Sequence, residues 1–284
     1  MTSTEKIALV AGASRPIGRG IARMLQQEGF TLVLPFFDDW PKDTESLCAE
    51  FSAVGSRHLV VPCDLRNREH VAALAHEIEK NFGELHVLVN NIERGGMPVV
   101  HGSYDLEVNR EQWDLEIATT LTAKQALFSS TLPLLKKAKG ASVVTITSIA
   151  GIVGRSGPAS LLFSDGYAAA NRAISSLTET WARMGAPDVR VNELMVGIMA
   201  HRHGEGTKGW SLLTDAQKKA LTDHILLGRS GAVQEIVDAV RFLALTGGYI
   251  TGAVLRLDGG YVLGGEKAAM PPGVMAGETE RRNK

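Results

Sequence analysis

Short runs of β-branched and apolar residues alternate along this chain with longer segments whose apolar residues recur at helical spacing. Seven runs predict strands at Ile7–Ala11, Thr31–Phe37, His58–Pro62, His86–Asn90, Ser142–Thr147, Val189–Leu194 and Ala253–Leu257. Helical segments begin near Ile17, Asp43, Arg66, Arg110, Tyr167 and Val233. Strands that alternate with helices form βαβ units, whose parallel sheet must be covered on both faces. The pattern predicts a doubly wound α/β fold of about seven parallel strands with helices on both faces.

Two segments depart from this alternation. Residues 198–227 are rich in glycine and then read Thr214–Gln217, a typical capped start of a helix. A long excursion after a strand's carboxyl end is typical of a lid over a substrate. Residues 266–284 combine proline, glycine and charge and are predicted to be a mobile tail. Nothing divides the chain before residue 264, so residues 1–265 are predicted to form one domain.

Composition narrows the choice of partners and compartment. The 284 residues are 44% hydrophobic, and their formal net charge is −1 with both signs interleaved. A nucleic-acid binder needs a basic patch, and a membrane span or signal peptide needs a longer apolar run than Ile7–Ala11. Only two cysteines occur, Cys48 and Cys63, which favours structural thiols in a reducing compartment. We therefore expect a cytoplasmic protein that acts on a small molecule and binds neither nucleic acid nor membrane.

The first strand leads into a glycine turn. Residues 6–20 read Lys-Ile-Ala-Leu-Val-Ala-Gly-Ala-Ser-Arg-Pro-Ile-Gly-Arg-Gly, and a helix begins near Ile17. A turn of this kind points the N–H groups of the helix, and the positive end of its dipole, at a phosphate. The turn between Gly12 and Gly18 therefore predicts a dinucleotide site in a Rossmann-type fold.

Six motifs in order resemble those of the short-chain dehydrogenase/reductase family. Residues 11–18 are similar to its Thr-Gly-x-x-x-Gly-x-Gly turn, and Cys63-Asp64-Leu65 resembles its adenine-contacting segment. The remaining four are Asn90-Asn91, Arg190-Val191-Asn192 with Gly197, Leu227-Gly228-Arg229, and Thr251-Gly252 with Asp258-Gly259-Gly260. The resemblance covers residues 6 to about 264 and implies an NAD(P)-dependent oxidoreductase.

The resemblance also implies which residues contact NAD(P)(H). They are Gly12, Ser14, Arg15, Ile17, Gly18, Asp64, Leu65, Asn91, Glu93, Asn171, Gly197 and Ile198. Three positions depart from the family pattern. Pro16 replaces the middle glycine, although its fixed φ suits the first residue of a helix. Glu93 replaces a glycine near the nicotinamide ribose, and Val196 replaces a proline.

The choice between NAD and NADP depends on the end of the second strand. An acid there reads a ribose hydroxyl, whereas Arg or Lys reads a 2′-phosphate. Phe36 stands in the acid's position, and Arg15 in the turn could meet a phosphate, whereas Asp38 and Asp39 follow closely and favour NAD. On balance NADP is slightly favoured.

The resemblance implies a catalytic tetrad of which two members are replaced. Ser148 at the end of a strand and Tyr167 match the family's serine and its proton-transferring tyrosine. Asn171 stands where the family has a lysine that lowers the tyrosine's pKa, and Thr120 stands in place of its asparagine. An amide supplies no positive charge, and acid–base help is worth about 10²–10⁴ in rate. An active enzyme with this site is expected to work mainly as a reductase.

Other residues could substitute for the missing groups. His201 and His203 could form a proton relay or a metal site, but with no third ligand in sight we interpret them as solvated lid residues and expect no metal. His101, Tyr104 and Lys124 are further candidates. Glu193 is interpreted as structural.

Three functions remain open. The first is an NAD(P)-dependent oxidoreductase that reduces a carbonyl-type substrate with a modified site. The second is a catalytically inactive nucleotide-binding or scaffold protein, favoured by Asn171, Thr120, Pro16 and Glu93 together. The third is a lyase or isomerase that uses the nucleotide structurally. Apolar faces on residues 113–135 and 167–184, compared with the family, predict a homodimer or homotetramer.

Overall fold

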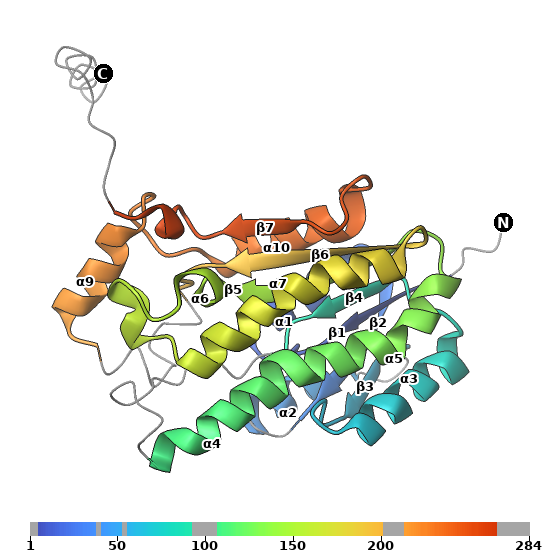
Figure 1. Ribbon diagram of the computed structural model, residues 1–284. Helices are drawn as coiled ribbons and strands as arrows, with labels where there is room; N and C mark the ends of the chain where they lie inside the picture. Colours follow the sequence, from blue (N-terminus) through green and yellow to red (C-terminus); the bar gives the residue numbers. More distant parts are fainter. Residues whose placement is uncertain (1–4, 38–40, 53–55, 93–106, 201–212, 266–284) are drawn as a thin grey trace, which may run out of the picture.

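The computed structural model describes residues 5–37, 41–52, 56–92, 107–200 and 213–265. Within them, seven parallel strands form one sheet in the order β3-β2-β1-β4-β5-β6-β7 (Figure 1). The strands are β1 (Lys6–Val10), β2 (Phe30–Phe36), β3 (Leu59–Pro62), β4 (Val87–Asn90), β5 (Ala141–Ser148), β6 (Val189–Val196) and β7 (Val254–Leu257). This arrangement confirms the predicted fold class and all seven predicted strands. Strands β5 and β6 run slightly further than predicted, to Ser148 and Val196.

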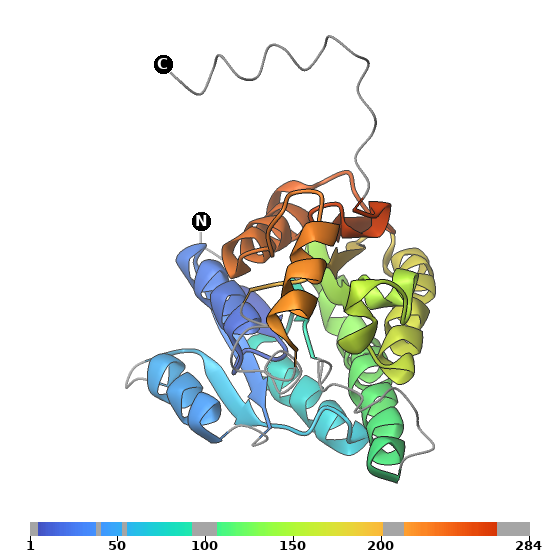
Figure 2. The ribbon, with the colours of Figure 1, turned by 90° about the vertical axis from the view of Figure 1, so that its left-hand side faces the viewer.

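The helices cover both faces of the sheet (Figure 2). They are α1 (Pro16–Gln27), α2 (Pro41–Phe51), α3 (Arg68–Phe82), α4 (Glu107–Glu116), α5 (Ala123–Lys137), α6 (Ala150–Val153), α7 (Asp165–Gly185), α9 (Asp215–His224) and α10 (Val233–Arg241). A π-helical segment, Ile117–Thr122, joins α4 to α5 into one long element that lies alongside α7 (Figure 1). In the part of the chain that is described, no helix combines the length and apolar character needed to cross a membrane.

Alternate residues of each strand supply two separate cores, because successive side chains of a strand point to opposite faces. Val143 and Val191 pack with side chains of α3, α5 and α7. Val144 and Leu194 pack with side chains of α1, α2 and α10. Both faces of the sheet are therefore buried, and the carboxyl ends of all strands meet at one edge.

The glycine turn between β1 and α1 retains its geometry despite its proline. Pro16 is the first residue of α1, preceded by Arg15 in an extended conformation (φ −102°, ψ 159°). Gly12 has a φ of +71°, and a Cβ there would lie 2.5 Å from the carbonyl oxygen of Asn91. A Cβ at Gly18 would overlap the carbonyl oxygen of Gly12. Only glycine fits at these two positions, whereas proline is accommodated at the helix start.

The substitution Pro16→Ala tests whether this proline stabilises the turn. A proline in a compatible conformation restricts the unfolded chain, so its removal should lower the free energy of unfolding by about 0.4–1 kcal/mol. Denaturant unfolding at equilibrium measures this difference. A variant more stable than the wild type would contradict the interpretation that Pro16 fits the helix start without strain.

Candidate functional site

The side chain of Arg19 on α1 links the glycine turn to α2 through hydrogen bonds. Its guanidinium is largely buried and donates from Nε to the carbonyl oxygen of Ala13 at 3.0 Å. The other nitrogens donate to the carbonyl oxygen of Asp43 at 3.0 Å and to Glu50 at 2.9 Å on α2. One side chain thus joins the turn to α2. Sequence reasoning missed this role, because nothing local distinguishes Arg19 from the exposed Arg23 one turn later.

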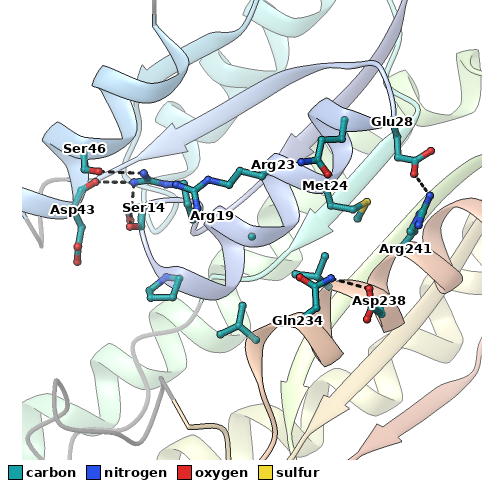
Figure 3. A pocket seen from close by; sticks show the side chains of 15 residues that line it. Ser14, Arg19, Arg23, Met24, Glu28, Asp43, Ser46, Gln234, Asp238 and Arg241 are labelled. Carbon is teal, nitrogen blue, oxygen red and sulfur yellow. Dashed lines mark hydrogen bonds and ion pairs between the residues drawn. The ribbon is translucent and has the colours of Figure 1, made fainter.

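A groove of about 910 Å³ lies on the outer side of α1, between this helix, the start of α2 and α10 (Figure 3). Most of its charged side chains form ion pairs, for example Arg23 with Glu50 and Arg241 with Glu28. Among the predicted site residues only Ser14 borders it. The groove therefore lies behind the predicted site, and we do not place the chemistry there.

Two arginines flank the ends of β2 and β3. Arg15 forms an ion pair with Asp43 at 3.0 Å, both side chains being partly exposed. Arg66 donates to both carboxylate oxygens of Asp64 at 2.8 Å, and these hydrogen bonds lower the pKa of Asp64. The guanidinium of Arg66 also lies over the ring of Phe37 at 4.8 Å. Two guanidinium groups therefore lie in the region predicted for the adenosine end.

The residues predicted for the nicotinamide end follow β4 and β6, the two strands that flank β5. Asn91 directly follows β4 and packs against Gly12, as the short distance from its carbonyl oxygen shows. Gly197 follows β6, where a Cβ would lie 2.7 Å from Cα of Asp258, and Ile198 beside it is buried. Leu65 is buried near β3. Glu93, Asp38 and Asp39 lie outside the described residues.

Ser148 and Tyr167 lie on neighbouring elements at the carboxyl edge. Ser148 is the last residue of β5, and its hydroxyl accepts a hydrogen bond from the backbone N–H of Ala150 at 3.2 Å. Tyr167 lies in the first turn of α7, whose N-cap Ser164 accepts the backbone N–H of Tyr167 at 3.1 Å. The Ser164 hydroxyl in turn donates to the buried carboxylate of Glu116 at 2.6 Å. The cap at Ser164 therefore fixes the start of α7 and, with it, the place of Tyr167 in the first turn.

Asn171 connects these two elements. Its side chain is fully buried, its Oδ1 accepts the backbone N–H of Ser148 at 3.0 Å, and its Nδ2 donates to the carbonyl oxygen of Tyr167 at 2.9 Å. The amide that is predicted to replace the family's lysine thus ties the end of β5 to α7. Its predicted contact with the nucleotide stays a prediction.

Thr120 lies inside the π-helical segment Ile117–Thr122. Within the described residues its hydroxyl is buried and has no hydrogen-bond partner. Single π-helical turns inside α-helices occur frequently at functional sites. The residue predicted to replace the family's asparagine therefore lies in a local distortion of the long helix.

The insertion between Ser148 and Tyr167 folds over the tyrosine. It forms α6 and a short 3₁₀ turn, Pro158–Leu161, and the ring of Phe163 lies 6.1 Å from that of Tyr167. Tyr261 supports the turn by accepting the backbone N–H of Ala159 at 2.8 Å. Only 3% of Tyr167 is exposed, so this insertion contributes to its burial.

The predicted lid is only partly described. The capped helix start at Thr214 is confirmed, because Thr214 and Gln217 form a capping box at the start of α9. His201, His203 and Trp210 lie outside the described residues, as do His101 and Tyr104. Over the described ranges, no cluster of three His, Cys, Asp or Glu side chains could hold a metal ion.

Comparison with known proteins agrees with this geometry. The sheet order and the glycine turn define a Rossmann-type α/β protein. Residues 12–262 match the sequence profile of a family described as enoyl-(acyl carrier protein) reductase. The chain belongs to the short-chain dehydrogenase/reductase family of NAD(P)-dependent oxidoreductases.

Similar proteins cover almost the whole chain. The 3-oxoacyl-[acyl-carrier-protein] reductase FabG of Staphylococcus aureus is 28% identical, over 90% of this chain and 97% of its own length. The protein of the same name from Haemophilus influenzae is 29% identical, over 91% and 98%. The crystal structure of a dehydrogenase/reductase from Sinorhizobium meliloti matches with a TM-score of 0.72 and 25% identity, over 90% of this chain and 94% of the other.

The substitution Asn171→Leu tests the link between β5 and α7. Leucine has a similar size but leaves the buried N–H of Ser148 without an acceptor, which should cost about 1–3 kcal/mol of unfolding free energy. Denaturant unfolding measures the loss. The matched control is Asn81→Leu on α3, whose exposed amide bonds only its own helix, and it should change stability by less than about 0.5 kcal/mol. Equal effects of both substitutions would contradict the proposed link.

Proposed function

We propose that this protein is an NAD(P)H-dependent reductase of a carbonyl compound, with Tyr167 as proton donor. The observation that carries the proposal is the arrangement at the carboxyl edge. Ser148 ends β5, Tyr167 opens α7, and Asn171 binds the backbone of both residues. Relatives named 3-oxoacyl-[acyl-carrier-protein] reductase support a carbonyl substrate.

The residues around the glycine turn fit a dinucleotide. A Cβ atom at residue 12 or 18 would clash with the backbone of the turn, and glycine avoids this clash at both positions. The N-terminus of α1 carries a positive partial charge suited to a pyrophosphate. We assign the pyrophosphate to the turn formed by Gly12, Ser14, Ile17 and Gly18, and we assign Arg15 of the same turn to the 2′-phosphate of NADPH. The adenine end is assigned to Asp64 and Leu65, and the nicotinamide end to Asn91, Glu93, Asn171, Gly197 and Ile198.

The chain's own residues supply binding, orientation and a proton. When bound, the reduced nicotinamide supplies the hydride. The Ser148 hydroxyl orients the carbonyl oxygen, and the Tyr167 phenol donates a proton to that oxygen as it gains negative charge. Burial of both side chains, each 3% exposed, keeps water away from the reacting group.

The direction of the reaction follows from Asn171. A free tyrosine has a pKa near 10, so its phenol is protonated at neutral pH and can donate. Oxidation of an alcohol requires the tyrosinate, which a neighbouring ammonium would stabilise and the neutral amide of Asn171 does not. Thr120 likewise offers only a hydroxyl in place of the family's asparagine. The protein is therefore proposed to favour reduction.

NADPH is proposed as the preferred nucleotide. Arg15 and Arg66 bring two guanidinium groups to the ends of β2 and β3, where a 2′-phosphate would lie. The acid that would read a ribose hydroxyl is replaced by Phe36.

We also propose that residues 1–265 form one domain with a lid at 198–227, and that the protein is a cytoplasmic homodimer or homotetramer.

A non-catalytic nucleotide-binding role is the alternative. The observation that favours it is that Asn171 uses its amide to bind backbone groups of its own chain, and that Thr120 is buried. The two functions differ in one measurable property. Both predict that NADPH binds, and only the reductase predicts that a carbonyl substrate oxidises it.

The substitution Tyr167→Phe tests the catalytic assignment. Loss of the proton donor should lower kcat for carbonyl reduction by about 10²–10⁴, while the Kd for NADPH stays unchanged because the phenol is not assigned to nucleotide binding. NADPH oxidation at 340 nm and calorimetric titration measure the two quantities. A wild-type protein that binds NADPH but reduces none of a panel of 3-oxoacyl thioesters, ketones and aldehydes would favour the non-catalytic role. Faster turnover in the oxidising direction at neutral pH would contradict the proposed direction.

The substitution Arg15→Ala tests the nucleotide preference. Loss of one charge-assisted hydrogen bond, about 1.5 kcal/mol, should raise the Kd for NADPH about tenfold and leave that for NADH nearly unchanged. Calorimetric titration with both nucleotides measures the ratio. The matched control is Arg23→Ala on α1, whose guanidinium is paired with Glu50. An equal loss of affinity for both nucleotides would show that Arg15 does not read the 2′-phosphate.

A further inference from the structure

A row of buried polar side chains crosses the sheet beneath the candidate site. Asn90, Thr145 and Glu193 are partners in register on β4, β5 and β6. All three are fully buried. Thr145 and Glu193 share the strand face of Val143 and Val191, which packs against α5 and α7. The row therefore lies between the sheet and the helix that carries Tyr167.

This row includes polar atoms that fold stability alone does not explain. Within the described residues, Oδ1 of Asn90 and Oγ1 of Thr145 are buried and have no hydrogen-bond partner, although Nδ2 of Asn90 donates to the carbonyl oxygen of Lys124 at 2.9 Å. Buried polar atoms without partners cost free energy, and a buried carboxyl such as that of Glu193 is often replaceable by an apolar side chain without loss of stability. A role in function explains these residues better than a role in stability does.

Two buried ionisable residues, Lys124 and Glu193, form hydrogen bonds with the end of β5. Pairing between β4 and β5 stops at Asn90 and Thr145, so among the described residues no strand pairs with the next residues of β5 on that side. The ammonium of Lys124, fully buried on α5, donates to the carbonyl oxygen of Ile146 at 2.6 Å. The hydroxyl of Thr147 donates to Oε1 of Glu193 at 2.5 Å.

Ser148, the next residue of β5, is also held by a side chain, because its backbone N–H donates to Oδ1 of Asn171. Ile146, Thr147 and Ser148 therefore each bind a buried side chain of another element. Glu193 also accepts the hydroxyl of Ser175 on α7, at 3.1 Å. Ser175 lies two turns after Tyr167 on the same helix. The carboxyl of Glu193 therefore holds both elements that carry the catalytic pair.

Lys124 and Glu193 also act on each other electrostatically. Burial raises the pKa of Glu193, and this is opposed by the hydrogen bonds from Thr147, Ser175 and Thr178 and by the positive charge of Lys124. Each partner thus lowers the cost of burying the other's charge. Neither residue is needed by the mechanism proposed above.

We propose that Lys124 and Glu193 are positioning residues, which hold the last three residues of β5 against α7 and thereby set Ser148 relative to Tyr167. This inference rests on the proposed reductase function. It assigns to the pair a role in the geometry of the site, because a small misplacement of catalytic groups costs far more in rate than in stability.

The double substitution Lys124→Met with Glu193→Leu separates the two roles. Replacement of these buried charged groups by apolar residues removes their desolvation cost but leaves the carbonyl oxygen of Ile146 and the hydroxyls of Thr147 and Ser175 without partners. The two effects oppose each other, so the Tm should change little. If the pair positions the site, kcat should fall about tenfold to a hundredfold, while KM and the Kd for NADPH change less than about threefold. The inference is overturned if kcat stays within about threefold of the wild type, or if kcat, Tm and nucleotide affinity all fall together.

Single substitutions keep the inference testable if the double variant does not fold. Thr147→Val removes the hydroxyl that Glu193 holds and is expected to lower kcat about tenfold. Glu193→Gln keeps an acceptor oxygen and should retain most of the wild-type kcat. The control is Thr131→Val on α5, a buried threonine whose hydroxyl bonds only backbone of its own helix and which should leave kcat unchanged. Wild-type kcat in Thr147→Val would overturn the inference.

Amide exchange distinguishes failure of this inference from failure of the proposed function. If the wild-type protein shows no turnover, the reductase function fails, and the pair can still be tested by hydrogen exchange of residues 146–150. Loss of the pair should raise their exchange at least about tenfold, because the strand end loses its side-chain partners, whereas Thr131→Val should not. Unchanged exchange in the pair variant would show that the pair does not hold this segment.

Discussion

The close approach of backbone at Gly12 is the constraint on which the candidate site depends. The carbonyl of Asn91 lies where a side chain of residue 12 would begin, and the carbonyl of Gly12 lies where a side chain of residue 18 would begin. β1, α1 and the end of β4 can therefore meet only with glycine at both positions. Arg19 secures the same turn by binding Ala13 and α2. The crevice assigned to the nucleotide follows from this packing, since it places the start of α1 beside the carboxyl ends of β1 and β4.

Two of the residues predicted to depart from the family pattern have backbone roles in this chain. Pro16 occupies the first position of α1, where no N–H is needed. Asn171 accepts the N–H of Ser148 beyond the end of β4 and donates to the carbonyl oxygen of Tyr167. Both side chains therefore support the backbone that carries the candidate site.

The row of buried polar side chains beneath the site shows a conflict between the stability of the fold and the positioning of the site residues. Hydrophobic side chains at Asn90, Thr145 and Glu193 would remove two buried polar atoms, in Asn90 and Thr145, that have no partners among the described residues. They would also remove the side chain that holds Thr147 and Ser175. Hydrophobic packing constrains a helix against a sheet mainly through shape, whereas a buried hydrogen bond specifies which atoms face each other. Buried hydrogen bonds therefore suit a site in which two side chains, such as those of Ser148 and Tyr167, must keep a fixed relative position.

The amino-acid sequence by itself determined the strands, the parallel α/β architecture, the glycine turn, the capped start of α9 and the strand end and helix on which Ser148 and Tyr167 lie. These features are local: periodicity, turn residues and capping residues act within a few positions of the chain. Only the tertiary structure decided the partners of Asn171, Lys124 and Glu193 and the ion pairs of Arg15 and Arg66. Thr147 and Glu193 are 46 positions apart, and Lys124 is 22 positions from Ile146. Such pairs meet only through the register of the sheet and the placement of α5 and α7 upon it, which depend on packing across the whole fold.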